Sequence, residues 1–374
     1  MTAPATTPDA IDAPDTGPGR AARWATSLAL ALIPIGLALV VSGLILASLG
    51  VDPIAFYQDI ITASIVRESG LYDSITRMAP LLLISSGLIF VFRAGLWNLG
   101  MDGQYLLAAA FVAGMGPWVM TQVPVVLGWL LLSLLAMAIG AAWTIIPAWL
   151  KARYGINEIV TTLMMSFIGV SLAAILVKGP FDGPGGTPQT DVLPLEAMLF
   201  DLPGTKVHFG VLVALLVSAI VYLIFARTSF GTRLDVMGAN PRAAVHLGIN
   251  VSRLIIVAFL ISGALIGLAA AIDIQGTFGF MRSNWNPAYG LAVVSLVFLA
   301  RMNALAVIPF AAFFSMLSIG SLYATRRASL PSDYGLLFTG LILLFMVGVQ
   351  YLFDKQARGE AILPKRLRKS VDDG

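Results

Sequence analysis

Long apolar runs separated by short polar segments make up most of the chain. A membrane-spanning helix needs about 20 consecutive apolar residues, the length that crosses the hydrocarbon core of a bilayer. The pattern therefore predicts an all-α fold, a polytopic membrane helix bundle with about ten transmembrane helices. The predicted spans, of which the eighth is the shortest, lie at residues 25–49, 74–92, 104–122, 125–149, 157–177, 208–226, 254–274, 288–300, 303–323 and 335–353.

The composition agrees with this pattern. Of the 374 residues, 58% are hydrophobic and 11% are charged, whereas a typical soluble domain has roughly 25% charged residues. The mean hydropathy is +0.88. So few charges cannot coat the surface of a soluble protein of this size, and an ordinary soluble enzyme is therefore excluded.

Missing residue types exclude several chemistries. The chain has no cysteine and two histidines, His208 and His246, and it contains neither an HExxH motif nor a GxxxxGK[ST] phosphate loop. We therefore expect no metal site, no cofactor and no catalytic residues. Any energy from ATP would have to come from a separate subunit. The basic residues lie in membrane-flanking loops rather than in one patch, so we expect no nucleic-acid partner.

The distribution of basic residues predicts the orientation, because lysine and arginine collect on the cytoplasmic side of membrane proteins. If the N-terminus is cytoplasmic and all ten spans cross, sixteen of the 23 basic residues lie inside and seven lie outside. Both termini are therefore predicted to be cytoplasmic. The predicted parts are a disordered tail at 1–24, a transmembrane domain at 25–353 with an outer loop at 178–207 and a cytoplasmic loop at 227–253, and a basic cytoplasmic tail at 354–374.

Two polar, glycine-rich interruptions separate apolar runs, at residues 93–104 and 275–287. If spans 2–5 and 7–10 form two inverted halves, the interruptions occupy matching places, as expected for a central transport pathway. The alternative is two ordinary turns at the membrane surface. The candidate pathway residues are Asn98, Asp102, Gln104, Asn157, Glu158, Thr161 and Phe278. Some of them could instead cap helices or belong to the interfacial aromatic belt.

The predicted cytoplasmic loop has the signals of two short helices. Thr228 or Ser229 can cap the first helix, and Pro241 suits the first position of the second helix. Gly248 then stops the second helix. A helix this short is marginal in water, so it needs a surface to pack against.

Four sequence blocks resemble one family. They are FRAGLWNLGMDGQ (92–104), INEIVTTLMMSFIG (156–169), GANPRAAVHLGI (238–249) and SRLIIVAFLISGALIGLAAAIDIQG (252–276). In order and spacing they are similar to the ABC importer permeases of the simple-sugar and nucleoside class, especially the larger permease subunit of guanosine-type uptake systems. The chain departs from the family at Met101 and Asp102, where Ala-Glu is common, and at Ala239, where an acidic residue is usual.

The resemblance implies a transport subunit of a bacterial cytoplasmic (inner) membrane. It implies four partners: an ABC ATPase subunit, a second and non-identical permease subunit, an extracytoplasmic solute-binding lipoprotein, and membrane lipid. The ATPase contact would be made by Gly238, Asn240, Pro241, Ala243, Ala244, Gly248 and Ile249.

Arg326 and Arg327 lie on the predicted outer side, against the positive-inside bias, and could dock the binding protein. The alternative interpretation is that the loop carrying these two arginines lies near lipid headgroups, or that it is on the cytoplasmic side. The expected cargo is a nucleoside or related ribose-containing solute. The alternatives are a permease for a simple sugar or a branched-chain amino acid, and a stand-alone secondary transporter.

Overall fold

A computed structural model describes residues 33, 36–184, 186–331 and 333–357 of the chain. In these residues the elements are helices, and β-structure is limited to two isolated bridges. The predicted tail at 1–24 lies outside the described residues, as does 358–374 of the predicted C-terminal tail.

Over its described residues, each of the ten predicted spans coincides with a helix; residues 25–32 and 34–35 of the first span lie outside the described part of the chain. Six of the described helices are long and apolar enough to cross a membrane, and α10 continues into the π-helix η3 (Ile274–Phe278). The predicted all-α membrane bundle is thereby confirmed. The helices that match the spans are Gly36–Ser48, α3 (Glu68–Arg93), α4 (Met101–Gln122), α5 (Val125–Tyr154), α6 (Glu158–Lys178), α7 (Gly210–Arg227), α10 (Val251–Asp273), α11 (Tyr289–Leu299), α12 (Val307–Arg327) and α13 (Asp333–Ala357).

Further helices lie in segments between the predicted spans. Residues 50–73, between the first two predicted spans, contain α2 (Pro53–Ile61), η1 (Thr62–Val66) and the start of α3. The predicted cytoplasmic loop contains α8 (Ser229–Ala239) and α9 (Pro241–His246), and the outer loop contains the short η2 (Leu195–Ala197). α3 begins before the predicted span, so Arg77 lies inside this helix.

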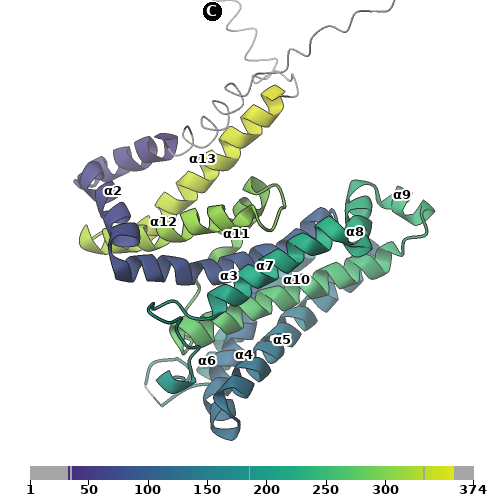
Figure 1. Cartoon of the computed structure of the whole chain (residues 1–374), viewed down its shortest axis with the longest axis horizontal. Coiled ribbons are helices and arrows are strands. Elements are labelled where there is room, and N and C mark those ends of the chain that lie inside the picture. Colours follow the sequence, from purple (N-terminus) through teal and green to yellow (C-terminus); the bar gives the residue numbers. More distant parts are fainter. Residues whose placement is uncertain (1–32, 34–35, 185, 332, 358–374) are drawn as a thin grey trace, which may run out of the picture.

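The centre of the bundle is α10, which packs closely against α5 and α3 (Figure 1). Small residues allow the backbones of α5 and α10 to touch: a Cβ added at Gly140 would lie 2.1 Å from the carbonyl oxygen of Gly263. A Cβ added at Gly267 would lie 2.0 Å from the carbonyl oxygen of Ala136. Close approach through small residues is the usual packing of helices in lipid, where apolar burial between helices provides little drive.

A second apolar cluster joins α2, α12, α13 and the helix Gly36–Ser48. Phe56 of α2 meets Tyr334 and Phe338 of α13 edge to face, with ring centroids 5.5 and 6.1 Å apart. These helices and α11 lie together on one side of α3 (Figure 1). The two clusters therefore divide the bundle into a group around α10 and a group around α12.

The two ends of the bundle carry different segments. The loop at 178–207, predicted to be outer, folds over the end of α10, with Leu193 N donating to Gly279 O and Thr190 N donating to Met281 O, each at 2.9 Å. At the opposite end of the long helices lie α8 and α9 (Figure 1). The fold thus presents one polar face made of loop and one made of short helices.

Candidate functional site

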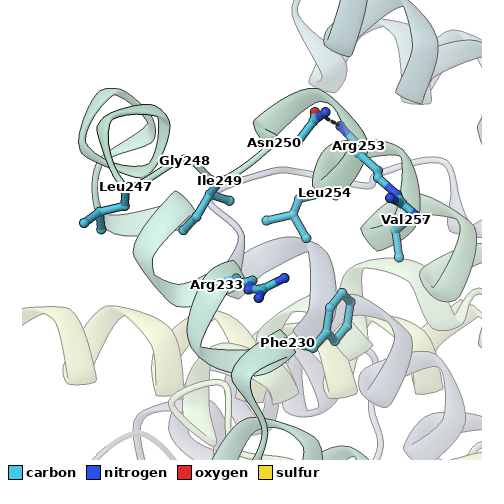
Figure 2. A pocket seen from close by; sticks show the side chains of 9 residues that line it. All are labelled: Phe230, Arg233, Leu247, Gly248, Ile249, Asn250, Arg253, Leu254 and Val257. Atoms are coloured by element: carbon cyan, nitrogen blue, oxygen red, sulfur yellow. Dashed lines mark hydrogen bonds between the residues drawn. The ribbon is translucent and has the colours of Figure 1, made fainter.

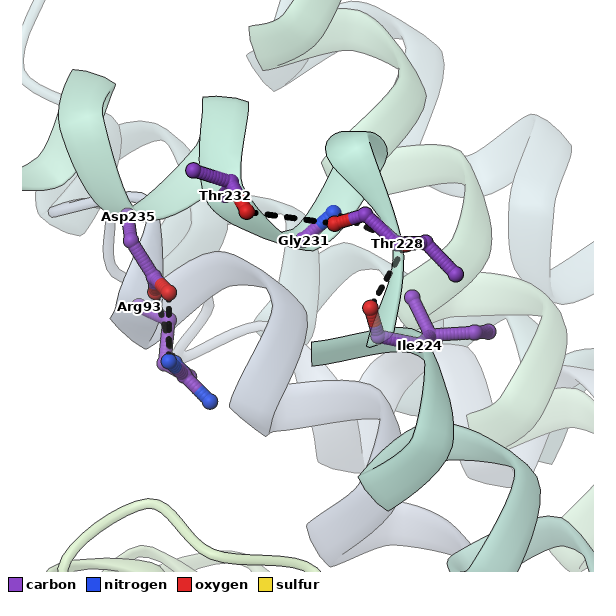
Figure 3. Close-up of polar contacts among 6 residues, drawn as sticks. All are labelled: Arg93, Ile224, Thr228, Gly231, Thr232 and Asp235. Atoms are coloured by element: carbon purple, nitrogen blue, oxygen red, sulfur yellow. Dashed lines mark hydrogen bonds and ion pairs between the residues drawn. The ribbon is translucent and has the colours of Figure 1, made fainter. Parts of the chain in front are cut away.

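The short helices at the end of α7 are positioned by a threonine cap. Thr228 Oγ1 accepts a hydrogen bond from Gly231 N at 3.2 Å, which starts α8, and donates one to Ile224 O at 2.6 Å, at the end of α7 (Figure 3). Thr232 Oγ1 donates to Thr228 O at 3.2 Å. The cap predicted at Thr228 or Ser229 is therefore Thr228, and it fixes the direction in which α8 leaves α7.

A bidentate ion pair attaches α8 to the end of α3. Arg93 Nε lies 2.7 Å from Asp235 Oδ1, and Arg93 Nη2 lies 2.5 Å from Asp235 Oδ2 (Figure 3). The same guanidinium lies over the ring of Phe225, 4.2 Å from its centroid. Paired geometry of this kind adds orientation as well as energy. α8 is therefore held to α3 by contacts that specify both distance and angle.

Gly238 allows the last turn of α8 to touch the chain that follows α3. A Cβ at Gly238 would lie 2.1 Å from Arg93 O, and one at Gly95 would lie 3.1 Å from the Cα of Gly238. Any side chain at Gly238 would therefore push α8 away from the end of α3. The structure thus gives Gly238 a role in packing within the chain.

The second predicted helix is present as α9 and is capped as its sequence indicates. Asn240 Oδ1 accepts hydrogen bonds from Arg242 N at 3.0 Å and Ala243 N at 3.1 Å, with Pro241 at the first helical position. Gly248 follows with φ of +73°, a backbone conformation that favours glycine. These residues shape the turn that presents α9.

The two alanines of α9 have different surroundings. Ala244 is fully buried in the main apolar cluster, whereas Ala243 is only half-buried. A partner protein cannot touch the Ala244 side chain without displacing α9, so its role in this structure is to seat the helix. The large apolar side chains exposed here are Val245, at 60%, and Leu247, at 70%, which the sequence analysis did not select.

The first interruption, after α3, runs inside the protein. Asn98 is fully buried; its side-chain nitrogen donates to Ser262 Oγ at 3.0 Å, and its oxygen accepts from Gln104 Nε2 at 2.9 Å. Asn98 Oδ1 also accepts from Gly100 N at 3.1 Å. Non-helical backbone at membrane depth requires such internal partners. Asn98 and Gln104, both candidate pathway residues, therefore form a buried hydrogen-bond network that contacts α10.

The second interruption, between η3 and α11, meets the first one. The carboxylate of Asp102 accepts a hydrogen bond from the backbone N–H of Gly290. Phe278 stacks edge-on against Trp285 at 4.8 Å, and Trp285 lies 5.9 Å from the ring of Tyr105. The structure thus brings Asp102 and Phe278 to one region of the bundle, from segments more than 170 positions apart.

A buried carboxylate lies at this meeting point. Asp273 Oδ2 accepts hydrogen bonds from Tyr105 at 2.5 Å and from Tyr289 at 2.9 Å. The guanidinium of Arg77 lies 5.3 Å from the centroid of the Tyr289 ring. We call Arg77, Tyr105, Asp273 and Tyr289 the central cluster. An ionisable group at membrane depth that bonds to other polar side chains indicates a functional region. No local sequence motif predicts the central cluster, because its members come from four different helices.

The candidates at the start of α6 have local partners instead. Asn157 Oδ1 accepts from Ile159 N at 2.9 Å, and Thr161 Oγ1 donates to Glu158 O at 3.2 Å. Glu158 forms an ion pair with Lys151 at 2.7 Å. The helix-capping alternative therefore accounts for the contacts of Asn157 and Glu158, and none of the three bonds to the central cluster.

The two outer arginines end α12 and are exposed. Arg327 forms an ion pair with Asp59 of α2, so its guanidinium already has a carboxylate partner within the chain. Arg326, the preceding residue of α12, is also exposed. Among the described residues, no group of three potential metal ligands is brought together.

Comparison with known proteins identifies similar chains. Residues 70–347 match a family described as branched-chain amino acid transport system / permease component. The chain is 30% identical to the glucose ABC transporter permease protein TsgB13 of Haloferax volcanii, over 84% of this chain and 85% of that protein. It is 28% identical to the guanosine ABC transporter permease protein NupP of Bacillus subtilis (73% of this chain, 80% of that protein) and 25% identical to the nucleoside ABC transporter permease protein NupB of Lactococcus lactis (89% and 92%). No solved structure matches the chain significantly.

Proposed function

Because this chain belongs to the permease family of the branched-chain amino acid transport system, we propose that it forms the translocation path for nucleosides or related ribose-containing solutes in an ATP-driven importer. The observation that carries this proposal is the similarity to the guanosine permease NupP and the nucleoside permease NupB, together with the family match over most of the transmembrane bundle. In this proposal the ATPase is a separate subunit, since the relatives NupP and NupB are permease proteins of ABC transporters. A solute-binding lipoprotein and a second permease subunit complete the proposed importer.

The proposed ATPase contact is the end of the bundle that carries α8 and α9. Leu247 and Val245 expose apolar surface there, and Asn240, Pro241 and Gly248 shape the turn that presents it. Ala243 and Ile249 are half-buried beside this surface. The ion pair of Arg93 with Asp235 supports the role, because a force applied to α8 would pass directly into α3.

The proposed path runs past the two interruptions. Non-helical backbone that is buried in protein, with polar groups facing one another, is typical of the centre of a transporter. The buried amides of Asn98 and Gln104 and the carboxylate of Asp102 support this placement. Arg326 remains a proposed docking point for the binding protein, and Arg327 would have to leave Asp59 in order to join it.

The proposed orientation places α8 and α9 in the cytoplasm and both termini on the same side, in a bacterial inner membrane. The positive-inside bias supports it. The proposed tails at 1–24 and 354–374, which precede and follow the transmembrane domain at 25–353 in the sequence, would then both extend into the cytoplasm.

The solute is tested by uptake. A strain that lacks its own nucleoside uptake, supplied with this chain and its partner subunits, is expected to accumulate labelled guanosine or uridine. A second candidate is a simple sugar, which the 30% identity to a glucose permease favours. Uptake of labelled glucose without nucleoside uptake would reject the leading proposal in favour of the second.

The ATPase contact is tested by co-purification. Leu247→Asp places a charge on the exposed apolar surface beside α9 and is expected to reduce ATPase recovery at least tenfold. Leu195→Asp is the matched control, because Leu195 is 87% exposed on η2 in the outer loop. Equal loss of ATPase in both variants, or in neither, would contradict the assignment. Uptake that continues without any ATPase subunit would indicate a stand-alone secondary transporter.

A further inference from the structure

A cavity of about 550 Å³ lies where α8, the turn after α9 and the start of α10 come together (Figure 2). Arg233 of α8 and Arg253 of α10 both line it, together with Phe230, Leu254 and Val257. Its remaining lining includes Leu247, Gly248 and Ile249, so the cavity borders the proposed ATPase contact. The two arginines enter from different walls, since they belong to different helices, and Figure 2 shows both side chains beside the same opening. We call this cavity the basic pocket.

The basic pocket has positive charge and no acidic residue among the residues that line it. The nearest acidic residue in the sequence of α8 is Asp235, whose carboxylate is occupied by Arg93. Asn250, which also lines the pocket, uses its side-chain oxygen to accept a hydrogen bond from Arg253 N at 3.0 Å. The ligand that such a pocket suits is an anion with several oxygens, because each guanidinium can donate two parallel hydrogen bonds.

The apolar wall distinguishes among anions. Val257 lies one helical turn beyond Arg253 along α10, in the direction of the membrane-spanning part, and Leu254 is buried beside it. Phe230 supplies an aromatic face from α8. A soluble phosphate makes no use of this wall, whereas the first methylene groups of a lipid would lie against it.

The depth of the basic pocket fits a lipid headgroup. Arg253 is the third residue of α10, and α8 begins directly after α7 ends, so both arginines lie at the level where spans leave the membrane. In the orientation proposed above, on which this inference rests, that level is the cytoplasmic leaflet. Basic residues near an anionic leaflet gain about 1 kcal/mol each.

We propose that the basic pocket binds the headgroup phosphate of an anionic phospholipid of the cytoplasmic leaflet, held between Arg233 and Arg253. The bound lipid fills the space between α8 and α10. It therefore braces the α8–α9 segment from the membrane side, opposite the pair of Arg93 with Asp235.

The test compares lipid retention by the purified importer complex in native mass spectrometry. Wild type is expected to retain phosphatidylglycerol in preference to phosphatidylcholine. The double variant Arg233→Gln, Arg253→Gln is expected to bind phosphatidylglycerol about 30-fold more weakly, the factor that two basic contacts give. Its phosphatidylcholine binding is expected to be unchanged. Arg242→Gln is the control, because Arg242 is an exposed arginine of α9 that does not line the pocket.

Each outcome decides the proposal. Equal phosphatidylglycerol retention by wild type and the double variant overturns it, provided that both complexes melt at the same temperature. If inorganic phosphate displaces bound phosphatidylglycerol as effectively as added lipid does, the ligand is a soluble anion, and the proposal is also overturned. Loss of the ATPase from the double variant in phosphatidylcholine alone assigns the arginines to a protein contact, the third overturning result. None of these measurements uses the transported solute, so an error in the solute leaves them unaffected.

Discussion

The ion pair between Arg93 and Asp235 gives the sharpest prediction, because it is the specific link between α3 and the segment that contacts the ATPase in our proposal. Replacing Asp235 by Asn keeps the shape of the side chain and removes its charge. We expect α8 to open more often from the end of α3, and coupled uptake to fall while ATPase binding persists.

The magnitude follows from the geometry. An exposed ion pair contributes about 0.2–1 kcal/mol, and a hydrogen bond to a charged group contributes about 1.5–3 kcal/mol. The side chains of Arg93 and Asp235 are 29% and 36% exposed, and two contacts of 2.7 and 2.5 Å join them. This intermediate environment predicts a coupling energy of about 1–2 kcal/mol, which corresponds to roughly a 5- to 30-fold change in an equilibrium.

Hydrogen exchange measures this change directly. In Asp235→Asn, amides of α8 are expected to exchange about 5- to 30-fold faster, and amides of α5 are expected to keep the wild-type rate. The double-mutant cycle with Arg93→Gln should return the coupling energy. Asp59→Asn is the control, because it removes the pair with Arg327, whose side chain is 72% exposed at the other end of the bundle. A cycle energy below about 0.3 kcal/mol, or unchanged exchange in α8, would refute the reasoning.

Three further predictions concern the stability of the bundle, each measured as a denaturation midpoint in detergent. Gly267→Ala should lower stability by about 1–3 kcal/mol, because its Cβ would lie 2.0 Å from a backbone oxygen of α5. Gly340→Ala is the control and should have little effect, because no atom lies within 4 Å of the added Cβ. Equal midpoints in the two variants would contradict the close packing. Tyr289→Phe removes one of the two tyrosine hydrogen bonds to buried Asp273 and should cost about 1.5–3 kcal/mol; an unchanged midpoint would show that this bond contributes nothing. Burial lowers the pKa of His208, two residues before the start of α7, to about 4. Wild type should therefore lose stability as the pH falls from 6.5 towards 4, and His208→Gln should lose less; identical pH profiles would count against this histidine.

Local signals predicted the helices well. Apolar length predicted ten spans; each coincides with a helix over its described residues, and six of these helices are long and apolar enough to cross a membrane. Turn chemistry predicted the cap at Thr228, the start of α9 at Pro241 and its end at Gly248. These features depend on residues close together in the sequence, so the sequence pattern contains them. The helices α2 and η1 were missed because they are shorter than a span and their apolar faces are completed by α12, which lies far along the chain.

The site was only partly predictable for the same physical reason. Asn98 and Asp102, predicted as pathway residues from the glycine-rich break, have polar partners inside the bundle, and their place in a pathway stays a prediction. Tyr105 and Tyr289 were not selected, because a tyrosine within an apolar run is usually a packing residue, and their shared carboxylate is known only once distant helices are placed together. The family resemblance placed Ala244 in the ATPase contact, whereas its burial depends on packing that no local pattern specifies.

The structure connects the two ends of the proposed mechanism through one helix. Arg93, at the end of α3, holds α8, and Arg77, earlier in α3, lies over Tyr289 in the central cluster. These two positions are separated by about 24 Å of helix at 1.5 Å per residue, and most of α3 between them is buried. A displacement of α8 can therefore reach the central cluster through α3 alone. If it does, Asp235→Asn and Tyr289→Phe disturb the same movement, so their losses of uptake should not multiply. The double variant should then transport almost as much solute as the single variant with the lower uptake. Fully multiplicative losses in uptake, measured at equal amounts of assembled complex, would mean that the two sites act independently and that α3 does not couple them.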